Sequence, residues 1–400
     1  MTTRQTRNMN YPTRILMQPN TICRSILLVA VLGVNFAHAA TPAPHPVADL
    51  LQPLVDHRAL AGAVTLVADK DKILDVECVG FADVGAHQAM QEDALFWIAS
   101  MSKAMTAAAL MILVDEGKVA LGDPVEKYLP EFIGQTVSTN PAAADAPSAQ
   151  PMHPITIRNI LSHTSGMAFS SPLENPTLDI HPLAERVKSY AKMPLQFQPD
   201  SKYQYSNAGI NTAGRIIEVI SGTSYEDFMQ KHLFDPLGMK DTTFLPDAAQ
   251  IARLAKSYKA NPAGTDLEET TVGQLKYPLN DRSRQPMPAG GLFSTAAETA
   301  RFCQMLINGG SFQGKRILSQ PAVSQMTSRQ TPAALPVSYG LGLSIDGDGY
   351  GHGGAFSTNM NVDTKRGLIT VFMVQNAGWS NEGKQAQPIF NKAAVDNFGH

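Results

Sequence analysis

Charged residues are scarce in this sequence, and neither sign dominates. Only 17% of the 400 residues are Asp, Glu, Lys or Arg, and 32 basic residues against 35 acidic ones give a net charge of −3. Nucleic-acid binding needs a basic footprint, so the composition gives no electrostatic case for that kind of partner. Hydrophobic residues make up 44% of the chain, which excludes collagen-like and disordered chains and is typical of a soluble globular protein with a sizeable core.

Acidic residues are absent from positions 1–39, which carry four Arg residues. An apolar run at 26–34 and the sequence Ala-His-Ala at 37–39 follow the arginines. The run is too short to cross a hydrocarbon core about 30 Å thick. The pattern therefore predicts a signal peptide cleaved near Ala39, a periplasmic or secreted protein, and no membrane span after cleavage. An uncleaved N-terminal anchor is the alternative.

Cysteine is rare, with three residues in the chain. Cys23 lies in the expected signal peptide, so only Cys78 and Cys303 remain in the mature chain. A scaffold of several disulfides is therefore excluded. Met9 or Met17 are alternative start residues of the signal peptide. Cys78 and Cys303 can form one bridge in an oxidising compartment, but both lie in apolar sequence, which favours two buried free thiols at least as strongly as a bridge. Removal of the signal peptide leaves 28 basic and 35 acidic residues, a net charge of −7.

Hydrophobic periodicity predicts strands at both ends of the chain and helices between them. Residues 61–68 and 72–79 are typical of a β-hairpin with a polar turn. The other predicted strands are 339–346, 360–363 and 368–375, and the predicted helices are 99–114, 208–220, 295–307 and one following Pro388. This order favours one sheet assembled from both ends of the chain, interrupted by a helical insertion. Residues 134–153 lack periodicity and predict a surface loop.

The motif with the clearest chemistry is the S-x-x-K of Ser100 and Lys103, at the start of a long apolar helix. Spacing of three places the hydroxyl and the amine on one helix face. A buried Lys can be neutral and accept the Ser proton, which activates the nucleophile. A second S-x-x-K, formed by Ser189 and Lys192, lies in a charged segment without an apolar helix to bury the Lys, and predicts a solvated helix face.

Two further motifs support a catalytic role for the first S-x-x-K motif. Tyr205 and Asn207 precede a predicted helix and supply a phenol that can relay a proton and an amide that can orient the substrate or the Lys. His352, Gly353 and Gly354 lie in the β-rich part, where small residues allow a substrate to approach a strand backbone closely. The same stretch spells G-x-G-x-x-G, but no strand-to-helix transition surrounds it, so a dinucleotide site is not predicted.

Other catalytic signatures are missing from the sequence. There is no H-E-x-x-H, and the histidines are scattered, so no metal site and no cofactor are predicted. The G-x-S-x-G nucleophile elbow is also absent.

The three motifs, in this order and spacing, resemble the serine β-lactamase and penicillin-binding-protein superfamily. The likeness is closest to the branch related to class C β-lactamases, which includes family VIII carboxylesterases and D-aminopeptidases. It covers about residues 45–398 and includes the stretches 97–100, 160–167, 288–295 and 339–342. The resemblance implies an α/β (α+β) fold of the β-lactamase/DD-peptidase type, with an antiparallel sheet flanked by helices. It places the α/β part at about 45–125 and 285–398 and an all-helical insertion at about 126–284.

The resemblance also implies a role for each motif residue. Ser100 is expected to be the nucleophile, Lys103 and Tyr205 the proton-transfer pair, and Asn207 a substrate-positioning group. His352, Gly353 and Gly354 are expected to position the substrate. The backbone N–H groups of Ser100 and Ala355 are expected to form the oxyanion hole. His163, in the stretch 160–167, is expected to be structural.

One departure from the family pattern bears on the substrate. Class C β-lactamases have K-T-G where this chain has His352, Gly353 and Gly354. A permanent ammonium is thus replaced by an imidazole that is mostly neutral near pH 7, which favours a neutral ester or amide over a carboxylate-bearing substrate. We therefore predict an exported serine hydrolase acting on a small ester, amide or peptide. The alternatives are a β-lactamase or D-Ala-D-Ala-type peptidase, and a non-turnover penicillin-binding or cell-wall-sensing module.

Overall fold

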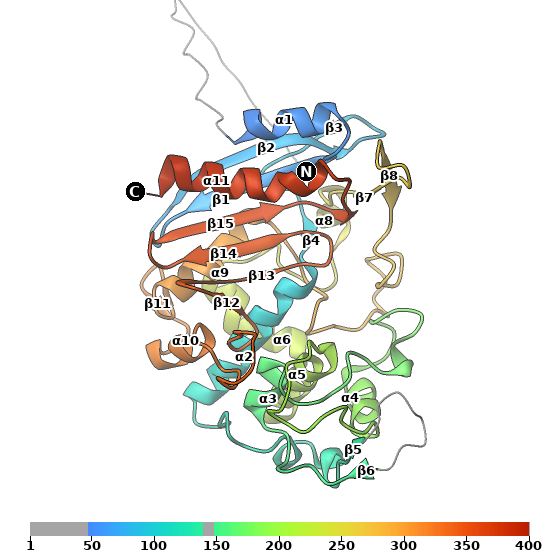
Figure 1. Ribbon diagram of the computed structural model, residues 1–400, viewed down its shortest axis with the longest axis vertical. Helices are drawn as coiled ribbons and strands as arrows, with labels where there is room; N and C mark the ends of the chain where they lie inside the picture. Colours follow the sequence, from blue (N-terminus) through green and yellow to red (C-terminus); the bar gives the residue numbers. More distant parts are fainter. Residues whose placement is uncertain (1–46, 139–147, 400) are drawn as a thin grey trace, which may run out of the picture. The chain divides into compact units, whose positions relative to one another are not determined.

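The two ends of the described chain meet in one seven-stranded antiparallel sheet (Figure 1). The computed structural model describes residues 47–138 and 148–399, so the predicted signal peptide lies outside the described residues. The strand order is β12-β13-β14-β15-β1-β2-β3, and Val64 of β1 lies opposite both Cys78 of β2 and Met373 of β15. The strands are β1 (Gly62–Ala68), β2 (Ile73–Asp83), β3 (Gln88–Ala89), β12 (Ser344–Asp346), β13 (Gly349–Gly353), β14 (Asn359–Asp363) and β15 (Leu368–Met373). The predicted hairpin and the sheet built from both ends are confirmed.

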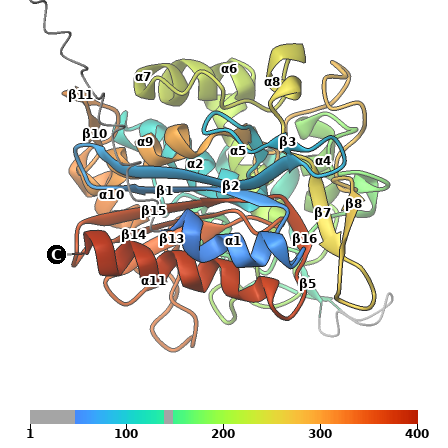
Figure 2. The same ribbon diagram turned by 90° about the horizontal axis from the view of Figure 1, so that it is seen from above.

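Helices cover both faces of this sheet, so its central strands are buried throughout (Figure 2). α1 (Ala48–Asp56) and α11 (Ala386–Phe398) lie on one face, and α2 (Ser102–Asp115) and α9 (Ala296–Ile307) on the other. Alternate residues of β1 point to opposite faces. Val64 and Leu66 join the core around α2, whereas Ala63 and Val67 join the core around α1 and α11.

Helix α2 is the central helix of the fold. Every side chain from Ser102 to Leu113 is buried, as expected for a helix that is hydrophobic all round. The helix is preceded by a 3-10 turn, η1 (Ala99–Met101), so the helix predicted from residue 99 begins three residues later as an α-helix.

The segment between the two parts of the sheet is mostly helical. In Figure 1 its residues 150–220 lie on the far side of α2 from α1 and α11, whereas its residues 257–270 lie level with the sheet. Its helices are α3 (Ile157–Ser162), α4 (Leu183–Ala191), α5 (Asn207–Ser221), α6 (Tyr225–Met229), α7 (Asp235–Leu237) and α8 (Ala248–Ala252), with short turns η2 (Val125–Lys127), η3 (Pro130–Phe132), η4 (Pro172–Glu174) and the π-helical η5 (Gln230–Phe234). The predicted helix at 208–220 is α5. The segment also contains short strands, so "all-helical" describes it only in part. They are β5 (Val137–Ser138), β6 (Ser148–Ala149), β7 (Ser257–Ala260) and β8 (Leu267–Thr270).

The remaining short elements lie near the sheet and the C-terminal part. They are β4 (Phe96–Trp97), β9 (Phe293–Ser294), β10 (Ser311–Phe312), β11 (Lys315–Arg316), β16 (Asn376–Gly378), α10 (Gln320–Met326) and η6 (Gly383–Gln385). β4 pairs with β9 directly before the first motif. This pairing ties residues 96–97 to the stretch that follows residue 288.

Three predicted segments differ in part from the structure. The strand predicted at 339–346 is confined to β12, because Gly342 has a φ of +69° and a Cβ there would lie 2.6 Å from the Lys103 carbonyl oxygen. The backbone therefore turns over α2 before it becomes extended. The last helix begins at Ala386, before Pro388, because proline is tolerated in the first turn, where no intrahelical N–H bond is lost. The predicted loop at 134–153 contains β5 and β6, and its residues 139–147 lie outside the described range.

Both cysteines that remain after the expected cleavage are free thiols. Cys303 is buried in α9, and Cys78 is half-buried in β2. Burial raises the pKa of the Cys303 thiol to about 12 and that of Cys78 to about 11, so neither is a reactive thiolate at neutral pH. Across residues 47–138 and 148–399, no helix has the length and apolar character needed to cross a membrane.

Candidate active site

Ser100 lies at the turn between β4 and α2, in a strained stretch of backbone. Ala99 adopts a φ of +45°, a region that residues with a Cβ rarely visit and that is often found at functional sites. The Ile98 N–H donates to the Leu292 carbonyl, and the Ser102 hydroxyl donates to the Ala99 carbonyl at 2.6 Å. These bonds hold the turn in place and leave Ser100 partly exposed at the start of the helix.

Lys103 is fully buried one turn further along α2, with three oxygen atoms around its amine. Nζ lies 2.8 Å from Asn207 Oδ1, 2.6 Å from the Ala289 carbonyl oxygen and 3.2 Å from Ser100 Oγ. Burial holds the pKa of Lys103 well below its ordinary value, because desolvation disfavours the ammonium. A neutral amine donates to Asn207 and Ala289, and its lone pair is then left to accept the Ser100 proton.

The ring of Tyr205 covers this amine, with Nζ 4.6 Å from the ring centroid. Burial raises the pKa of the Tyr205 phenol above its ordinary value, and a hydrogen bond with the Ser100 side chain opposes the rise. Tyr205 is therefore a neutral phenol at pH 7 that can donate a proton next to Ser100. The structure brings Ser100, Lys103 and Tyr205 into one cluster.

His163 packs directly against Tyr205, with the ring centroids 4.5 Å apart. Its Nδ1 accepts the Ser206 backbone N–H at 3.2 Å, which places the ring proton on Nε2. Nε2 has no hydrogen-bond partner among residues 47–138 and 148–399. Burial and the nearby Lys103 hold the pKa of His163 well below its ordinary value. His163 is thus a neutral support for the 205–207 segment, in keeping with the structural role predicted for it.

Asn207 begins helix α5, and Ser206 caps that helix by accepting the Gly209 N–H. The Asn207 backbone N–H donates to the Phe169 carbonyl, which leaves its side chain directed to Lys103. The amide predicted to position the substrate or the Lys therefore contacts the Lys.

The third motif lies on β13 and in the turn after it. His352 is buried, its Nδ1 contacts the Gly353 carbonyl at 2.7 Å, and its Nε2 contacts the Tyr339 hydroxyl at 3.0 Å. Burial lowers the pKa of His352 to about 4, so the imidazole is neutral at pH 7. Both ring nitrogens of His352 contact groups of the protein itself. His352 would therefore influence a substrate by holding the shape of β13.

Gly354 lies against the turn that carries Ser100. A Cβ there would lie 2.6 Å from the Ile98 carbonyl oxygen and 2.0 Å from Thr358 Oγ1, so only glycine permits this approach. The Ala355 N–H donates to no backbone carbonyl in the described turns, and neither does that of Ser100. Both amides are available for the predicted oxyanion hole.

Sequence reasoning missed two groups that this geometry adds. The Ala289 carbonyl is a main-chain atom with no side-chain signal, although residues 288–295 belong to a stretch that resembles the family. Asn211 lies in the middle of α5, where an Asn attracts no notice, and it binds the Ala289 N–H. Among the described residues, no group of three or more His, Cys, Asp or Glu is placed to hold a metal ion.

The second S-x-x-K does not reproduce this environment. Lys192 is exposed just after α4, in agreement with the prediction. Ser189 is half-buried, and its hydroxyl lies 2.6 Å from both the Ser171 hydroxyl and the Arg186 carbonyl. The second motif therefore lacks a buried amine beside its serine.

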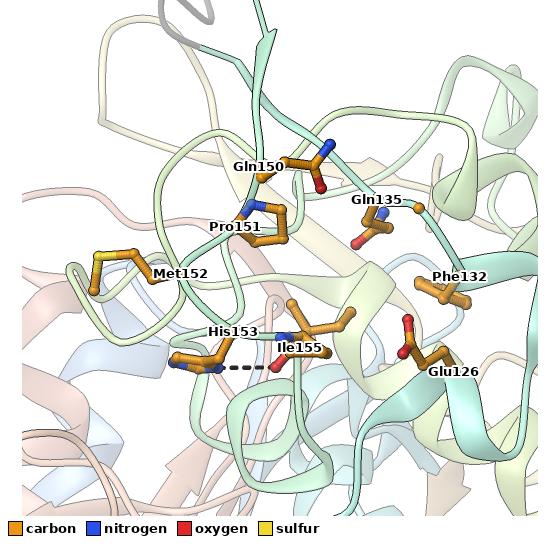
Figure 3. Close-up of a pocket in the computed structure, with 10 residues that line it drawn as sticks. Glu126, Phe132, Gln135, Gln150, Pro151, Met152, His153 and Ile155 are labelled. Atoms are coloured by element: carbon orange, nitrogen blue, oxygen red, sulfur yellow. Dashed lines mark hydrogen bonds between the residues drawn. The ribbon is translucent and has the colours of Figure 1, made fainter.

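A separate cavity of about 260 Å³ lies beside the loop predicted at 134–153 (Figure 3). Its titratable wall groups are Glu126 and His153, and Phe132, Gln135 and Met152 are among its other lining residues. Among the described residues that line it there is no Ser, Thr or Cys, so these residues offer no nucleophile for an acyl-enzyme. The residues predicted to be catalytic lie elsewhere.

Comparisons with known proteins identify the family and the fold of this chain. A family model described as Beta-lactamase matches residues 47–393. Protein Rv1367c of Mycobacterium tuberculosis is 31% identical over 82% of this chain and 88% of its own length. Esterase EstB of Burkholderia gladioli is 33% identical over 50% of this chain and 51% of its own. The solved structure of EstCE1, a hydrolase with promiscuous acyltransferase activity, superposes with a TM-score of 0.73 at 21% identity, covering 87% of this chain and 97% of that chain.

The chain belongs to the beta-lactamase family, within the serine β-lactamase and penicillin-binding-protein superfamily. It is an enzyme of the serine hydrolase class, and its fold is that of the β-lactamases. The resemblance stated from the motifs is therefore confirmed at the level of family and fold.

Proposed function

We propose that this protein is an exported hydrolase of neutral esters or small amides that forms an acyl-enzyme on Ser100. The observation that carries the proposal is the buried Lys103 amine, which contacts Ser100 Oγ at 3.2 Å and has a pKa well below its ordinary value. The esterase relative supports an ester substrate. Export rests on the sequence of residues 1–39 alone.

In the acylation step, the lone pair of Lys103 Nζ accepts the Ser100 proton while Oγ attacks the acyl carbon. The electron pair of the carbonyl moves to its oxygen, which the N–H groups of Ser100 and Ala355 stabilise. Collapse of this intermediate expels the alkoxide or amine, which takes a proton from the Tyr205 phenol. Lys103 then passes the proton it took from Ser100 to Tyr205. Lys103 and Tyr205 are thereby restored, and Ser100 carries the acyl group.

Hydrolysis of the acyl-enzyme uses the same groups in reverse. Water loses a proton to the Lys103 and Tyr205 pair as its oxygen attacks the acyl carbon. The Ser100 oxygen leaves with the bonding electrons and takes that proton back. The products are a carboxylic acid and the original enzyme.

The neutral His352 supports a neutral substrate. With a pKa of about 4, it supplies no cation at the position where class C β-lactamases have the Lys of K-T-G. A substrate carboxylate would lose its bonds to water without an ion pair in return. An ester or small amide carries no such penalty.

Turnover of three substrates in parallel tests this proposal. We expect hydrolysis of a short p-nitrophenyl ester to exceed that of a D-alanyl peptide and of a chromogenic cephalosporin. Ser100→Ala should abolish turnover, and a fluorophosphonate probe should label Ser100. Retained turnover in Ser100→Ala would refute the nucleophile. Faster cephalosporin or peptide hydrolysis would refute the substrate class, and penicillin labelling without turnover of any substrate would support a binding or sensing module instead.

A further inference from the structure

Two asparagines one turn apart on α5 act on the same amine. Asn207 contacts Lys103 Nζ directly, through its Oδ1 at 2.8 Å. Asn211 accepts the Ala289 N–H at 3.0 Å, and the Ala289 carbonyl contacts Lys103 Nζ at 2.6 Å. Residues four apart share a helix face. One face of α5 therefore carries two side chains that orient the amine. Asn207 contacts the amine directly, and Asn211 acts through Ala289.

We propose that Asn211 is a positioning residue for the reaction at Ser100, which it serves by fixing the Ala289 carbonyl that orients Lys103. This inference rests on the proposed function, since it assumes that Lys103 is the base. Asn211 contacts neither Ser100 nor Lys103 in the described hydrogen bonds. It acts on the amine through Ala289.

A buried polar network holds Asn211 in turn. Its Nδ2 lies 2.9 Å from the Tyr190 hydroxyl and 3.4 Å from Glu174 Oε1, and Tyr190 donates to Glu174 Oε1 at 2.6 Å. Arg186 lies 3.8 Å from the same carboxylate. Donation from Nδ2 to the carboxylate side leaves Oδ1 facing the Ala289 N–H, so the network sets which way the amide points.

The neighbours of Ala289 are tethered independently of Asn211. The Pro288 carbonyl accepts from the Thr106 hydroxyl at 2.7 Å, and the Gly290 carbonyl accepts from Trp97 Nε1 at 2.7 Å. Loss of Asn211 should therefore loosen Ala289 without releasing the whole segment. A change of that kind alters the alignment of the amine more than the binding of substrate.

The test measures fluorophosphonate labelling of Ser100 and steady-state ester hydrolysis, both per folded molecule. Asn211→Leu keeps the branching of the side chain at Cγ and removes the acceptor. We expect the labelling rate and kcat to fall roughly tenfold to a hundredfold, as for a reacting group displaced by about 1 Å, while KM stays within about twofold because the substrate contacts remain. The matched control is Thr212→Val, since Thr212 is equally buried and its hydroxyl donates to the Ala208 carbonyl in its own helix; it should retain the wild-type values.

A charge-conserving exchange keeps the test decisive if Asn211→Leu folds poorly. Asn211→Asp alone places a second carboxylate at the 3.4 Å contact with Glu174 and should be impaired. The double variant Asn211→Asp with Glu174→Gln restores an amide facing a carboxylate, and its Asp oxygen can still accept the Ala289 N–H. We expect the double variant to be more active than Asn211→Asp.

The outcomes separate this inference from the proposed function. Wild-type labelling in Asn211→Leu, or a double variant no more active than Asn211→Asp, would overturn the role of Asn211. Turnover retained by Ser100→Ala in the same series would overturn the proposed function, whatever the Asn211 variants do. Loss of activity in Ser100→Ala together with normal Asn211 variants would refute the positioning role alone.

Discussion

The neutral Lys103 leads to a prediction about stability that needs no substrate. A Lys whose pKa is lower in the folded than in the unfolded protein binds fewer protons when folded. Folding then becomes more favourable as pH rises between the two pKa values, and the penalty disappears above the ordinary pKa of 10.5. We expect Lys103→Met to lose this pH dependence, because it removes the group that titrates.

The expected size follows from one proton. Linkage gives about 1.4 kcal/mol per pH unit for one titrating group. The free energy of unfolding of the wild type, minus that of Lys103→Met, should therefore rise by about 1.4 kcal/mol per pH unit over the interval between the lowered pKa in the folded protein and the ordinary pKa. The variant also leaves the Asn207 and Ala289 oxygens without their donor, at about 1–3 kcal/mol each, but this loss does not vary with pH. The slope is thus the informative quantity.

The contributions of other titrating groups cancel in the difference between the two free energies of unfolding. His163 and His352 have lowered pKa values and are neutral throughout the interval. Cys78 and Cys303 have raised pKa values in the folded state, but both variants contain them. Urea unfolding in the presence of a reductant, at five pH values, measures the slope. A difference that does not change with pH would mean that Lys103 folds as an ammonium, and would refute its assignment as the base.

Three other substitutions test the surroundings of Ser100. Gly354→Ala should lower kcat by about a hundredfold to a thousandfold, comparable to the loss of an oxyanion donor, because its Cβ would lie 2.6 Å from the Ile98 carbonyl; unchanged steady-state kinetics would contradict the close approach. His163→Phe should lower the free energy of unfolding by about 1–3 kcal/mol, measured in urea, since the buried Ser206 N–H loses its acceptor; equal stability would argue against that bond. Ala99→Gly should relieve backbone strain of about 1–3 kcal/mol and yet lower kcat as the turn loosens, and a faster enzyme would refute a role for the strain.

The motif residues were predictable because each is a side chain with its own chemistry at a fixed spacing. Ser100 and Lys103 are one helical turn apart, and Tyr205 and Asn207 lie where a helix begins. The hairpin of β1 and β2 was predictable from its apolar runs and polar turn. These are local properties of the chain, so they could be stated before any contact was known.

Non-local approaches were not predictable in the same way. The first part of the strand predicted at 339–346 is a turn, because the backbone at Gly342 lies close to Lys103. A Cβ at position 342 would be 2.6 Å from the Lys103 carbonyl oxygen. Asn211 and the Ala289 carbonyl entered the site because α5 packs beside α2. Neither a mid-helix Asn nor a main-chain oxygen differs in sequence from many others.

The sequence by itself determined the family and the spacing of Ser100 and Lys103, since S-x-x-K fixes two side chains on one helix face. The protonation states of Lys103 and His163 were decided only by the tertiary structure, whereas the residue type alone already indicated a mostly neutral His352. A pKa depends on how much water the surrounding elements exclude and on which charges they bring near. Residues from distant parts of the chain enclose the Lys103 amine, and that enclosure lowers its pKa well below the ordinary value.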